Sequence, residues 1–288
     1  MKIKKVWAIC FSTIVVAGLT VTAIQYYATA ESVKPLSKSE INSNQSVLLS
    51  QIGNNEITLA NQTIYKKAES EKDGITYQID SEIMPQKNSS TILEKWNTYQ
   101  DNDKNVYRLS KEIGFREYSS YEYDNNLLTP KTQSSASLDK NDITDQKIKD
   151  LLKETIPVES LIPDIDQYQI KSVDQSDFLS VTLNKGISKD LKDQIFVDIG
   201  SNGQIGHIGT YKTNLTEITD SQKSKFQQAF DQYLKSYKEK YDYYTCGEIT
   251  YKRISDKIIA NYPVIYHTKA ESGEDLALGD LVSFAIDV

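Results

Sequence analysis

Residues 219–288 decide the fold, and they read TDSQKSKFQQAFDQYLKSYKEKYDYYTCGEITYKRISDKIIANYPVIYHTKAESGEDLALGDLVSFAIDV. Thr219 and Asp220 are typical N-cap residues, because their side-chain oxygens accept hydrogen bonds from the first free amides of a helix. The apolar residues that follow recur every three or four positions, as one face of an α-helix requires: Phe226, Ala229, Phe230, Tyr233, Leu234, Tyr237 and Tyr241. This pattern predicts one long amphipathic helix, and we expect the residues just before Cys246 to be helical.

Three strand-like segments follow this helix, at residues 248–254, 257–267 and 276–288. They are rich in Ile, Val and Tyr, and short polar turns separate them. A helix with such a wide apolar face must cover another element, and a sheet built from these strands is the simplest solution. We therefore predict that residues 219–288 form a helix packed on an antiparallel sheet.

Residues 142–213 resemble a looser form of the same unit. A short amphipathic helix is predicted at residues 143–156 and is stopped by Pro157. Strands are predicted after it, at residues 168–173, 178–183, 195–199 and 204–211. The order of a helix followed by strands thus occurs twice, which indicates a duplicated α+β unit.

The part of the chain before residue 142 is predicted to be rich in strands. Partial alternation and polar turns indicate strands at residues 57–59, 75–79, 91–99, 106–113 and 115–123. We predict an antiparallel domain over residues 54–130, a Ser-rich linker at residues 131–141 and a tether at residues 31–53. The expected fold class is α+β, with this strand-rich domain followed by two helix-on-antiparallel-sheet units.

Residues 1–30 have the composition of an export signal. Lys2, Lys4 and Lys5 precede an uncharged, mostly apolar run over residues 6–24, and Ala28-Thr29-Ala30 is a small-x-small cleavage site. The apolar run approaches the ~20 residues that span a bilayer. The leader is therefore either a signal peptide cleaved after Ala30 or an uncleaved membrane anchor. In both cases the rest of the chain is expected outside the cytoplasmic membrane, secreted or at the cell surface, because the lysines stay inside.

Charge and cysteine content limit the function further. The chain carries 33 basic and 40 acidic residues, a formal charge of −7. Without the three leader lysines the balance is 30 against 40, or −10. This argues against nucleic acid, which is bound mainly through Lys and Arg on phosphate, and against an anionic membrane surface. Cys246 is the only cysteine after the leader, so the exported part has no intramolecular disulfide.

One segment resembles a known family. Residues 197–205, VDIGSNGQI, are similar to the strand–turn–strand signature of PepSY and YcdB-like extracytoplasmic domains, and Asn202-Gly203 favours a hairpin turn by itself. Residues 260–266, ANYPVIY, are similar to the strand before that signature, although the second unit lacks the Asn-Gly turn. The same architecture occurs in YycI-type regulators, which act on a sensor kinase. The resemblance covers residues 143–288, implies a binding or regulatory module and transfers no catalytic residues.

One acidic stretch resembles a calcium loop. Oxygen-bearing side chains occupy its first, third, fifth and twelfth positions, where an EF-hand places ligands: Asp101, Asp103, Asn105 and Glu112. The sixth position requires glycine for a sharp turn and here holds Val106. A polar hairpin turn is therefore the better interpretation, and we expect no metal and no cofactor.

Cys246 is the one candidate nucleophile. Tyr244-Thr245-Cys246 followed by Arg253 resembles the end of the nucleophile strand in sortases, and His207 would have to supply the histidine. A lone thiol near a helix end is more often a small packed apolar residue.

These observations predict an exported, non-enzymatic binding or regulatory protein that recognises a protein or peptide at a bacterial cell surface. Two alternatives remain open. The first is an enzyme, either a transpeptidase-like enzyme that uses Cys246 or a hydrolase built on carboxylates. The second is a structural surface component with no specific ligand.

Overall fold

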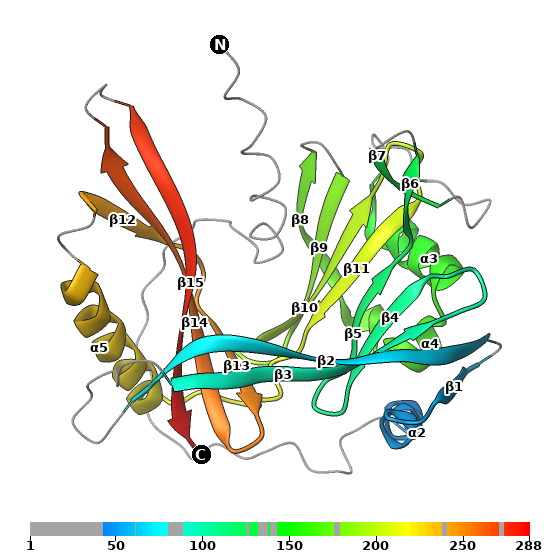
Figure 1. The fold of residues 1–288 in the computed structure, drawn as a ribbon, viewed down its shortest axis with the longest axis horizontal. Helices are drawn as coiled ribbons and strands as arrows, with labels where there is room; N and C mark the ends of the chain where they lie inside the picture. Colours follow the sequence, from blue (N-terminus) through cyan, green and yellow to red (C-terminus); the bar gives the residue numbers. More distant parts are fainter. Residues whose placement is uncertain are drawn as a thin grey trace. The chain divides into compact units, whose positions relative to one another are not determined.

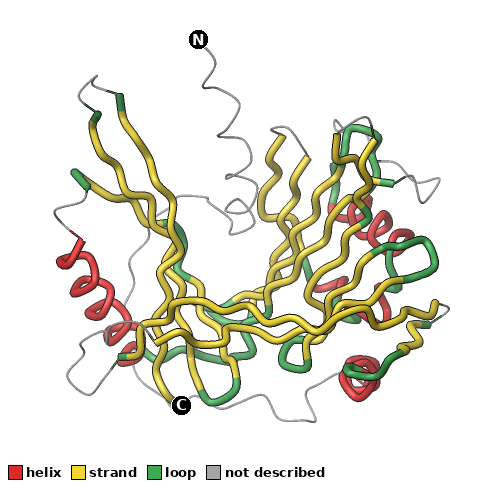
Figure 2. Tube along the Cα trace, in the orientation of Figure 1, coloured by secondary structure: helices red, strands yellow, loops and turns green. Residues whose placement is uncertain are grey.

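The structure is a computed structural model that describes residues 43–60, 62–79, 89–124, 127–131, 138, 143–175, 179–237, 241–270 and 274–288. Strands make up most of these residues (Figure 2). The predicted leader at residues 1–30 and most of the predicted linker at residues 131–141 lie outside the described residues. No described helix is long and apolar enough to cross a membrane.

The chain forms two compact units, and neither is one continuous segment. Of the residues that the structure describes, unit 1 contains those within Asp73–Thr91 and Thr213–Val288, and unit 2 contains those within Leu36–Lys72 and Ile92–Lys212. Strands β2 (Gln62–Gln78) and β3 (Ser89–Gln100) contribute residues to both units.

Unit 2 is built mainly from antiparallel strands. Its helices are α2 (Ser43–Gln51), α3 (Asp145–Thr155) and α4 (Val158–Leu161), with a short 3₁₀ helix, η2 (Ile165–Gln167). Besides β2 and β3, its strands are β1 (Glu56–Leu59), β4 (Val106–Ser110), β5 (Gly114–Ser119), β6 (Tyr121–Asp124), β7 (Leu127–Pro130), β8 (Gln169–Gln175), β9 (Leu179–Gly186), β10 (Lys192–Ile199) and β11 (Ile205–Tyr211). Figure 1 labels most of these elements.

The strand order in unit 2 brings distant segments together. Its sheet has the order β2-β3-β4-β5-β11-β10-β9-β8, while β6 and β7 form a separate hairpin. The central pairing joins β5 to β11, with His207 opposite Ser119 and Gly209 opposite Glu117. Since the two strands are far apart in the sequence, this pairing positions side chains that local patterns cannot relate to one another.

One face of this sheet forms the core. Leu179, Val181 and Leu183 are buried on alternate positions of β9, as a strand with one covered face requires. Strands β4, β5, β10 and β11 and helices α2, α3 and α4 contribute to the same hydrophobic cluster. We call the opposite face of the sheet the open face.

The tether prediction is wrong from residue 43 onward. Ser43–Gln51 is helix α2, and Leu48 and Ile52 are buried in the core of unit 2. The Ser- and Asn-rich composition suggested a loop, but Leu48 and Leu49 pack in or against the hydrophobic core and allow this helix to form. The predicted helix at residues 143–156 is confirmed as α3, whose first turn is capped when Thr144 Oγ1 accepts from Lys147 N.

Unit 1 contains the described part of residues 219–288. Helix α5 (Asp220–Tyr237) is followed by β12 (Tyr243–Cys246), β13 (Thr250–Ile254), β14 (Lys257–Lys269) and β15 (Asp275–Asp287). The strand order is β12-β14-β15-β2, and β13 pairs with another part of β14. Thr219 and Gln222 form a reciprocal capping box at the start of α5, which confirms the predicted cap at Thr219.

Aromatic side chains fill the space between α5 and the strands. Phe230 of α5 stacks on Tyr262 of β14, with ring centroids 4.3 Å apart. Phe284 of β15 lies edge-on to Tyr262 at 5.6 Å and to Tyr233 at 6.0 Å. Because each buried aromatic side chain removes a large apolar area from water, these contacts are the main stabilising feature of α5 in this unit.

The residues before Cys246 form a strand, so the prediction that they are helical is wrong. Residues 243–246 pair with residues 264–267 of β14. Two tyrosines and a threonine favour a strand, and β14 supplies their backbone hydrogen bonds. Tyr241 lies outside α5, although its ring still packs on Tyr266 at a centroid distance of 5.1 Å.

Candidate functional site

Four neighbouring strands place charged side chains beside one another on the open face of unit 2. Asp198 of β10 lies opposite His207 of β11, and Arg108 of β4 lies opposite Glu117 of β5. Residues that face each other across antiparallel strands project from the same side of the sheet. We call Arg108, Glu117, His207 and Asp198 the charged row.

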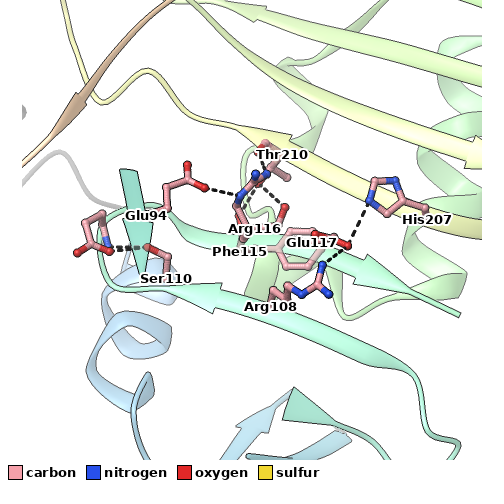
Figure 3. A network of polar contacts seen from close by, with 9 residues as sticks. Glu94, Arg108, Ser110, Phe115, Arg116, Glu117, His207 and Thr210 are labelled. Carbon is pink, nitrogen blue, oxygen red and sulfur yellow. Dashed lines mark hydrogen bonds and ion pairs between the residues drawn. The ribbon is translucent and has the colours of Figure 1, made fainter. Parts of the chain in front are cut away.

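Contacts between the four side chains join the row into one network, part of which is drawn in Figure 3. Arg108 Nη1 donates to Glu117 Oε1 at 2.6 Å, and His207 Nε2 lies 3.6 Å from the same oxygen. On its other side, His207 Nδ1 lies 3.3 Å from Asp198 Oδ2, within ion-pair distance but outside hydrogen-bond alignment. Ser180 of β9 donates to the second oxygen of Asp198 at 2.6 Å.

The electrostatic environment holds His207 and Glu117 in their charged forms. Burial alone would lower the pKa of His207, but Asp198 and Glu117 outweigh that effect and raise its pKa to about 9. Burial would likewise raise the pKa of Glu117, yet His207 and Arg108 lower it to about 2. At neutral pH His207 is therefore mostly a cation and Glu117 an anion.

A glycine makes room for the imidazole. A Cβ atom on Gly209 would lie 3.2 Å from His207 Cε1 and 3.8 Å from Phe196 Cδ2. The ring of His207 therefore lies close over the backbone of Gly209, which is the residue opposite Glu117. A side chain at position 209 would press against the imidazole of His207 in the position from which it contacts Glu117.

A bulge in β5 directs Glu117 toward His207. Arg108 pairs with Glu117 but Leu109 pairs with Phe115, so Arg116 is the extra residue. The buried hydroxyl of Thr210 donates to the carbonyl of Phe115, and Arg116 Nη1 donates to the carbonyl of Thr210 at 3.3 Å (Figure 3). These bonds fix the bulge that brings Glu117 into the row.

The turn between β10 and β11 supports the β6–β7 hairpin. Ser120 N donates to the carbonyl of Gly206 at 2.9 Å, and Asn202 Nδ2 donates to the carbonyl of Pro130 at 3.0 Å. A Cβ on Gly206 would lie 2.4 Å from the ring of Tyr121. The Asn202-Gly203 turn, which carries the sequence resemblance, is therefore a packing surface for this hairpin.

A second group of charges lies at one end of the strands of unit 2. Lys185 Nζ lies 2.5 Å from Asp164 and 3.3 Å from Asp193, and Lys212 Nζ lies 3.6 Å and 3.5 Å from the same carboxylates. The hydroxyl of Tyr168 accepts from Lys212 at 2.6 Å. Two lysines and two aspartates thus balance each other, which is the arrangement expected of a structural cluster.

The candidate thiol set is distributed over the two units. Cys246 and Arg253 belong to unit 1, on β12 and β13, whereas His207 belongs to unit 2. Burial raises the pKa of the Cys246 thiol to about 11, so the nucleophilic thiolate is scarce at neutral pH. Arg253 Nε donates to the carbonyl of Ser255 at 2.9 Å.

The residues of the calcium-loop pattern form a hairpin turn, as predicted. Asp101 Oδ1 accepts from Asn105 N at 2.8 Å, and Lys104 takes a left-handed conformation with φ of 63°. Glu112 instead accepts from Ser110 at 2.5 Å, and the backbone carbonyl of Asp103 accepts from Lys131. Within the described ranges, no three His, Cys, Asp or Glu side chains gather as a metal site requires.

The other histidine lies in a polar cluster of unit 1. His267 Nδ1 lies 3.1 Å from Asp275 Oδ2, and Thr245 Oγ1 lies 3.5 Å from His267 Nε2. Tyr243 stacks on the imidazole at 4.3 Å and donates to Asp275 at 2.7 Å. This hydrogen bond lowers the pKa of Asp275.

Sequence reasoning missed three of the four residues in the charged row. It named His207 only as a possible partner of Cys246, and it gave no role to Arg108, Glu117 or Asp198. Asp198 is part of the recognised turn segment, but its neighbour His207 is specified by strand register. No sequence signal pairs Glu117 with β11.

No model of a protein family matches this sequence, and no curated protein or solved structure is significantly similar to it.

Proposed function

We propose that this protein is an exported, non-enzymatic binding module that recognises a protein or peptide partner on the open face of unit 2. The observation that carries the proposal is the charged row, a fixed set of charges on the sheet face opposite the core. Ser119 and Thr182 lie on the same face, because they pair with His207 and Phe196 respectively. Such a face offers both charge and hydroxyl groups to a polypeptide.

The location and finer architecture belong to the same proposal. The leader over residues 1–30 directs the chain out of the cytoplasm, as a cleaved signal or as an anchor. The segments over residues 142–213 and 219–288 are two related helix-on-sheet modules, similar to PepSY and YcdB-like domains. A regulatory role of the YycI type, exerted by binding another surface protein, is consistent with that relation.

The chemistry of His207 supports binding over catalysis. A general base must be deprotonated near the working pH, and an imidazole with a pKa of about 9 is mostly protonated at pH 7. Both nitrogens of His207 also lie beside carboxylates. His207 therefore acts as a fixed cation within the row.

The experiment is site-specific photo-crosslinking in cells that produce the protein. A photoreactive amino acid replaces Ser119 on the open face, and a matched variant carries it at Glu154 on α3. We expect a discrete adduct from position 119 that is absent from position 154. The proposal is wrong if position 119 gives no adduct under conditions in which the folded variant is recovered at normal levels.

A hydroxyl-based candidate for the enzyme class is the Thr245–His267–Asp275 cluster. Its order of hydroxyl, imidazole and carboxylate is that of a nucleophile, a base and an orienting acid. The distance of 3.5 Å from Thr245 Oγ1 to His267 Nε2 is long for an activated nucleophile. Asp275 also accepts a hydrogen bond from the hydroxyl of Tyr243, in addition to its contact with His267. Labelling by a fluorophosphonate probe that is lost in Thr245→Ala would favour this class.

The thiol alternative is tested by alkylation. With a thiol pKa of about 11, Cys246 should react with iodoacetamide at a rate that keeps rising up to about pH 11. A rate that already reaches its plateau below pH 8 would indicate an activated thiol and favour the transpeptidase-like enzyme.

A further inference from the structure

Strand β15 has one fully paired edge and one edge that is paired only near its end. Along β14, every residue from Asp275 to Asp287 has a partner. On the other side, β2 pairs in parallel with residues 283–285 alone. In the part of the chain that the structure describes, no strand pairs with that edge over residues 275–282. Figure 1 shows β14 and β15 as one long hairpin.

The backbone groups that face this edge can be identified. Ile79 N donates to the carbonyl of Ala285, so the odd-numbered residues of β15 direct their backbone groups away from β14. By the same alternation, the backbone N–H and C=O groups of Ala277, Gly279 and Leu281 point toward the part of this edge that β2 does not pair with. The N–H of Leu281 donates to Asp280 Oδ1 at 2.8 Å, as expected of a donor with no strand beside it.

The side chains along this edge suit an added strand. Leu276 and Leu278 are 48 % and 70 % exposed and lie on one face of β15, while Ala277 and Gly279 lie on the other. A glycine in a strand often marks a place where another backbone approaches closely. An exposed, apolar edge strand is also the usual template for strand addition by an extended peptide.

The acidic residues along this edge indicate which kind of strand could be added to it. Residues 274–282 contain Glu274, Asp275 and Asp280 and no basic residue. A second copy of β15 would bring three more carboxylates to the same edge, and like charges across paired strands are destabilising. A segment that alternates apolar and basic residues would instead pack its apolar residues on Leu276 and Leu278 and place its basic residues on the other face of β15, where Asp275 lies.

We propose that residues 275–281 of β15 are a docking edge for an extended peptide segment that alternates apolar residues with lysine or arginine. This site lies in unit 1 and shares no residue with the charged row of unit 2. This proposal can therefore be tested independently of the proposed function.

The test uses synthetic peptides and the ¹⁵N-labelled protein. A peptide that alternates valine and lysine is titrated while amide shifts and amide exchange are recorded. We expect shifts and slowed exchange at Ala277 and Gly279 of β15. Two control peptides are matched in length, one with glutamate in place of lysine and one with methylated backbone nitrogens along the edge that would pair. Both should bind at least tenfold more weakly.

Two variants complete the test. Asp275→Asn keeps an oxygen that can accept from Tyr243 but removes the charge on the face that receives the lysines, so the valine–lysine peptide should bind roughly threefold more weakly at low salt. Ala277→Pro removes an edge-facing donor without touching the bonds to β14, and should abolish binding.

Three results would overturn the proposal. They are equal binding of the methylated peptide, equal binding of the valine–glutamate peptide, and amide shifts that fall elsewhere in the protein. Self-association of the protein through β15 would do the same, because it would identify a second copy as the occupant. If Ala277→Pro does not fold, the methylated peptide tests the same hydrogen bonds without any change to the protein.

Discussion

His207 illustrates how a residue acquires its properties from register. Its neighbours along the chain are glycine and isoleucine, and none of them shifts its pKa. The carboxylates that hold it as a cation come from β5 and β10, and Arg108 on β4 shares Glu117 with it. A histidine that is protonated at neutral pH can pair with carboxylates and donate hydrogen bonds, but it is a poor general base.

The first prediction concerns pH. Since the folded-state pKa of His207 is raised from 6.5 to about 9, its stabilisation is complete below pH 6.5 and is lost as pH rises through 9. Since the pKa of Glu117 is lowered from 4.5 to about 2, its stabilisation is complete above pH 4.5 and is lost toward pH 2. We expect the charged row to contribute most to the free energy of unfolding between about pH 4.5 and 6.5, by roughly 1–3 kcal/mol.

Urea unfolding of the wild type and His207→Gln across this range measures the effect. Glutamine keeps hydrogen-bonding capacity but carries no charge. The wild type should lose stability between pH 6.5 and 9, and the variant should be less stable at pH 6 and change less over the same interval. Parallel curves for the two proteins would show that the carboxylates do not hold the imidazole charged.

The second prediction concerns the hydroxyl that fixes the β5 bulge. Thr210→Val preserves shape but leaves the carbonyl of Phe115 without its buried donor. We expect a loss of about 1–2 kcal/mol in the free energy of unfolding. Thr182→Val on the open face is the matched control and should change stability by less than about 0.5 kcal/mol. Equal effects of the two substitutions would mean that the bulge does not depend on Thr210.

At the scale of elements, local patterns predicted the regular parts of the structure well. The apolar residues that recur every three or four positions from Phe226 onward predicted α5. Strand-like segments predicted β9, β10, β11, β14 and β15 close to their observed bounds. Local patterns failed where tertiary contacts decide the structure. Helix α2 forms because Leu48 and Ile52 pack in a core built from other segments, and β12 forms because β14 pairs with it.

The third prediction concerns the docking of the β6–β7 hairpin on β11. Gly206→Ala would place a methyl group 2.4 Å from the Tyr121 ring, so the ring or the hairpin must move. We expect a cost of about 1–3 kcal/mol in the free energy of unfolding. Gly186→Ala is the control, because a Cβ there meets nothing within 4 Å.

The double substitution Gly206→Ala, Tyr121→Ala tests the cause. Removal of the ring should eliminate the clash, so the two effects should be clearly non-additive. If the double variant loses the full sum of both single effects, the hairpin does not rest on Gly206 as described. Thermal unfolding of the four proteins gives the comparison.

At the scale of the whole molecule, the division of the chain into units was outside the reach of sequence patterns. Each unit takes segments from separate parts of the chain, and residues 92–130 share unit 2 with residues 143–212. The candidate site depends on the same long-range pairing, because β5 pairs with β11 although residues 120–204 lie between the two strands in the sequence. Periodicity reports which face of a strand is buried, but it does not report which strand lies next to it.

The two proposed binding surfaces belong to different units of the molecule. Composition and the leader predict an exported protein that binds a polypeptide. The charged row of unit 2 is the surface that we propose for this binding. The docking edge on β15 adds a second surface with a different chemistry. The two surfaces can be tested separately, because substitutions in one unit leave the residues of the other unchanged.

The central claim is that the charged row of unit 2 contacts the partner. Its most direct test is calorimetric titration of the partner captured at position 119 against the wild type, Asp198→Asn and the control Asp150→Asn, which changes an exposed aspartate on α3. We predict at least tenfold weaker binding for Asp198→Asn, about 1.4 kcal/mol, and no change for Asp150→Asn. Equal affinity of all three proteins would contradict the account.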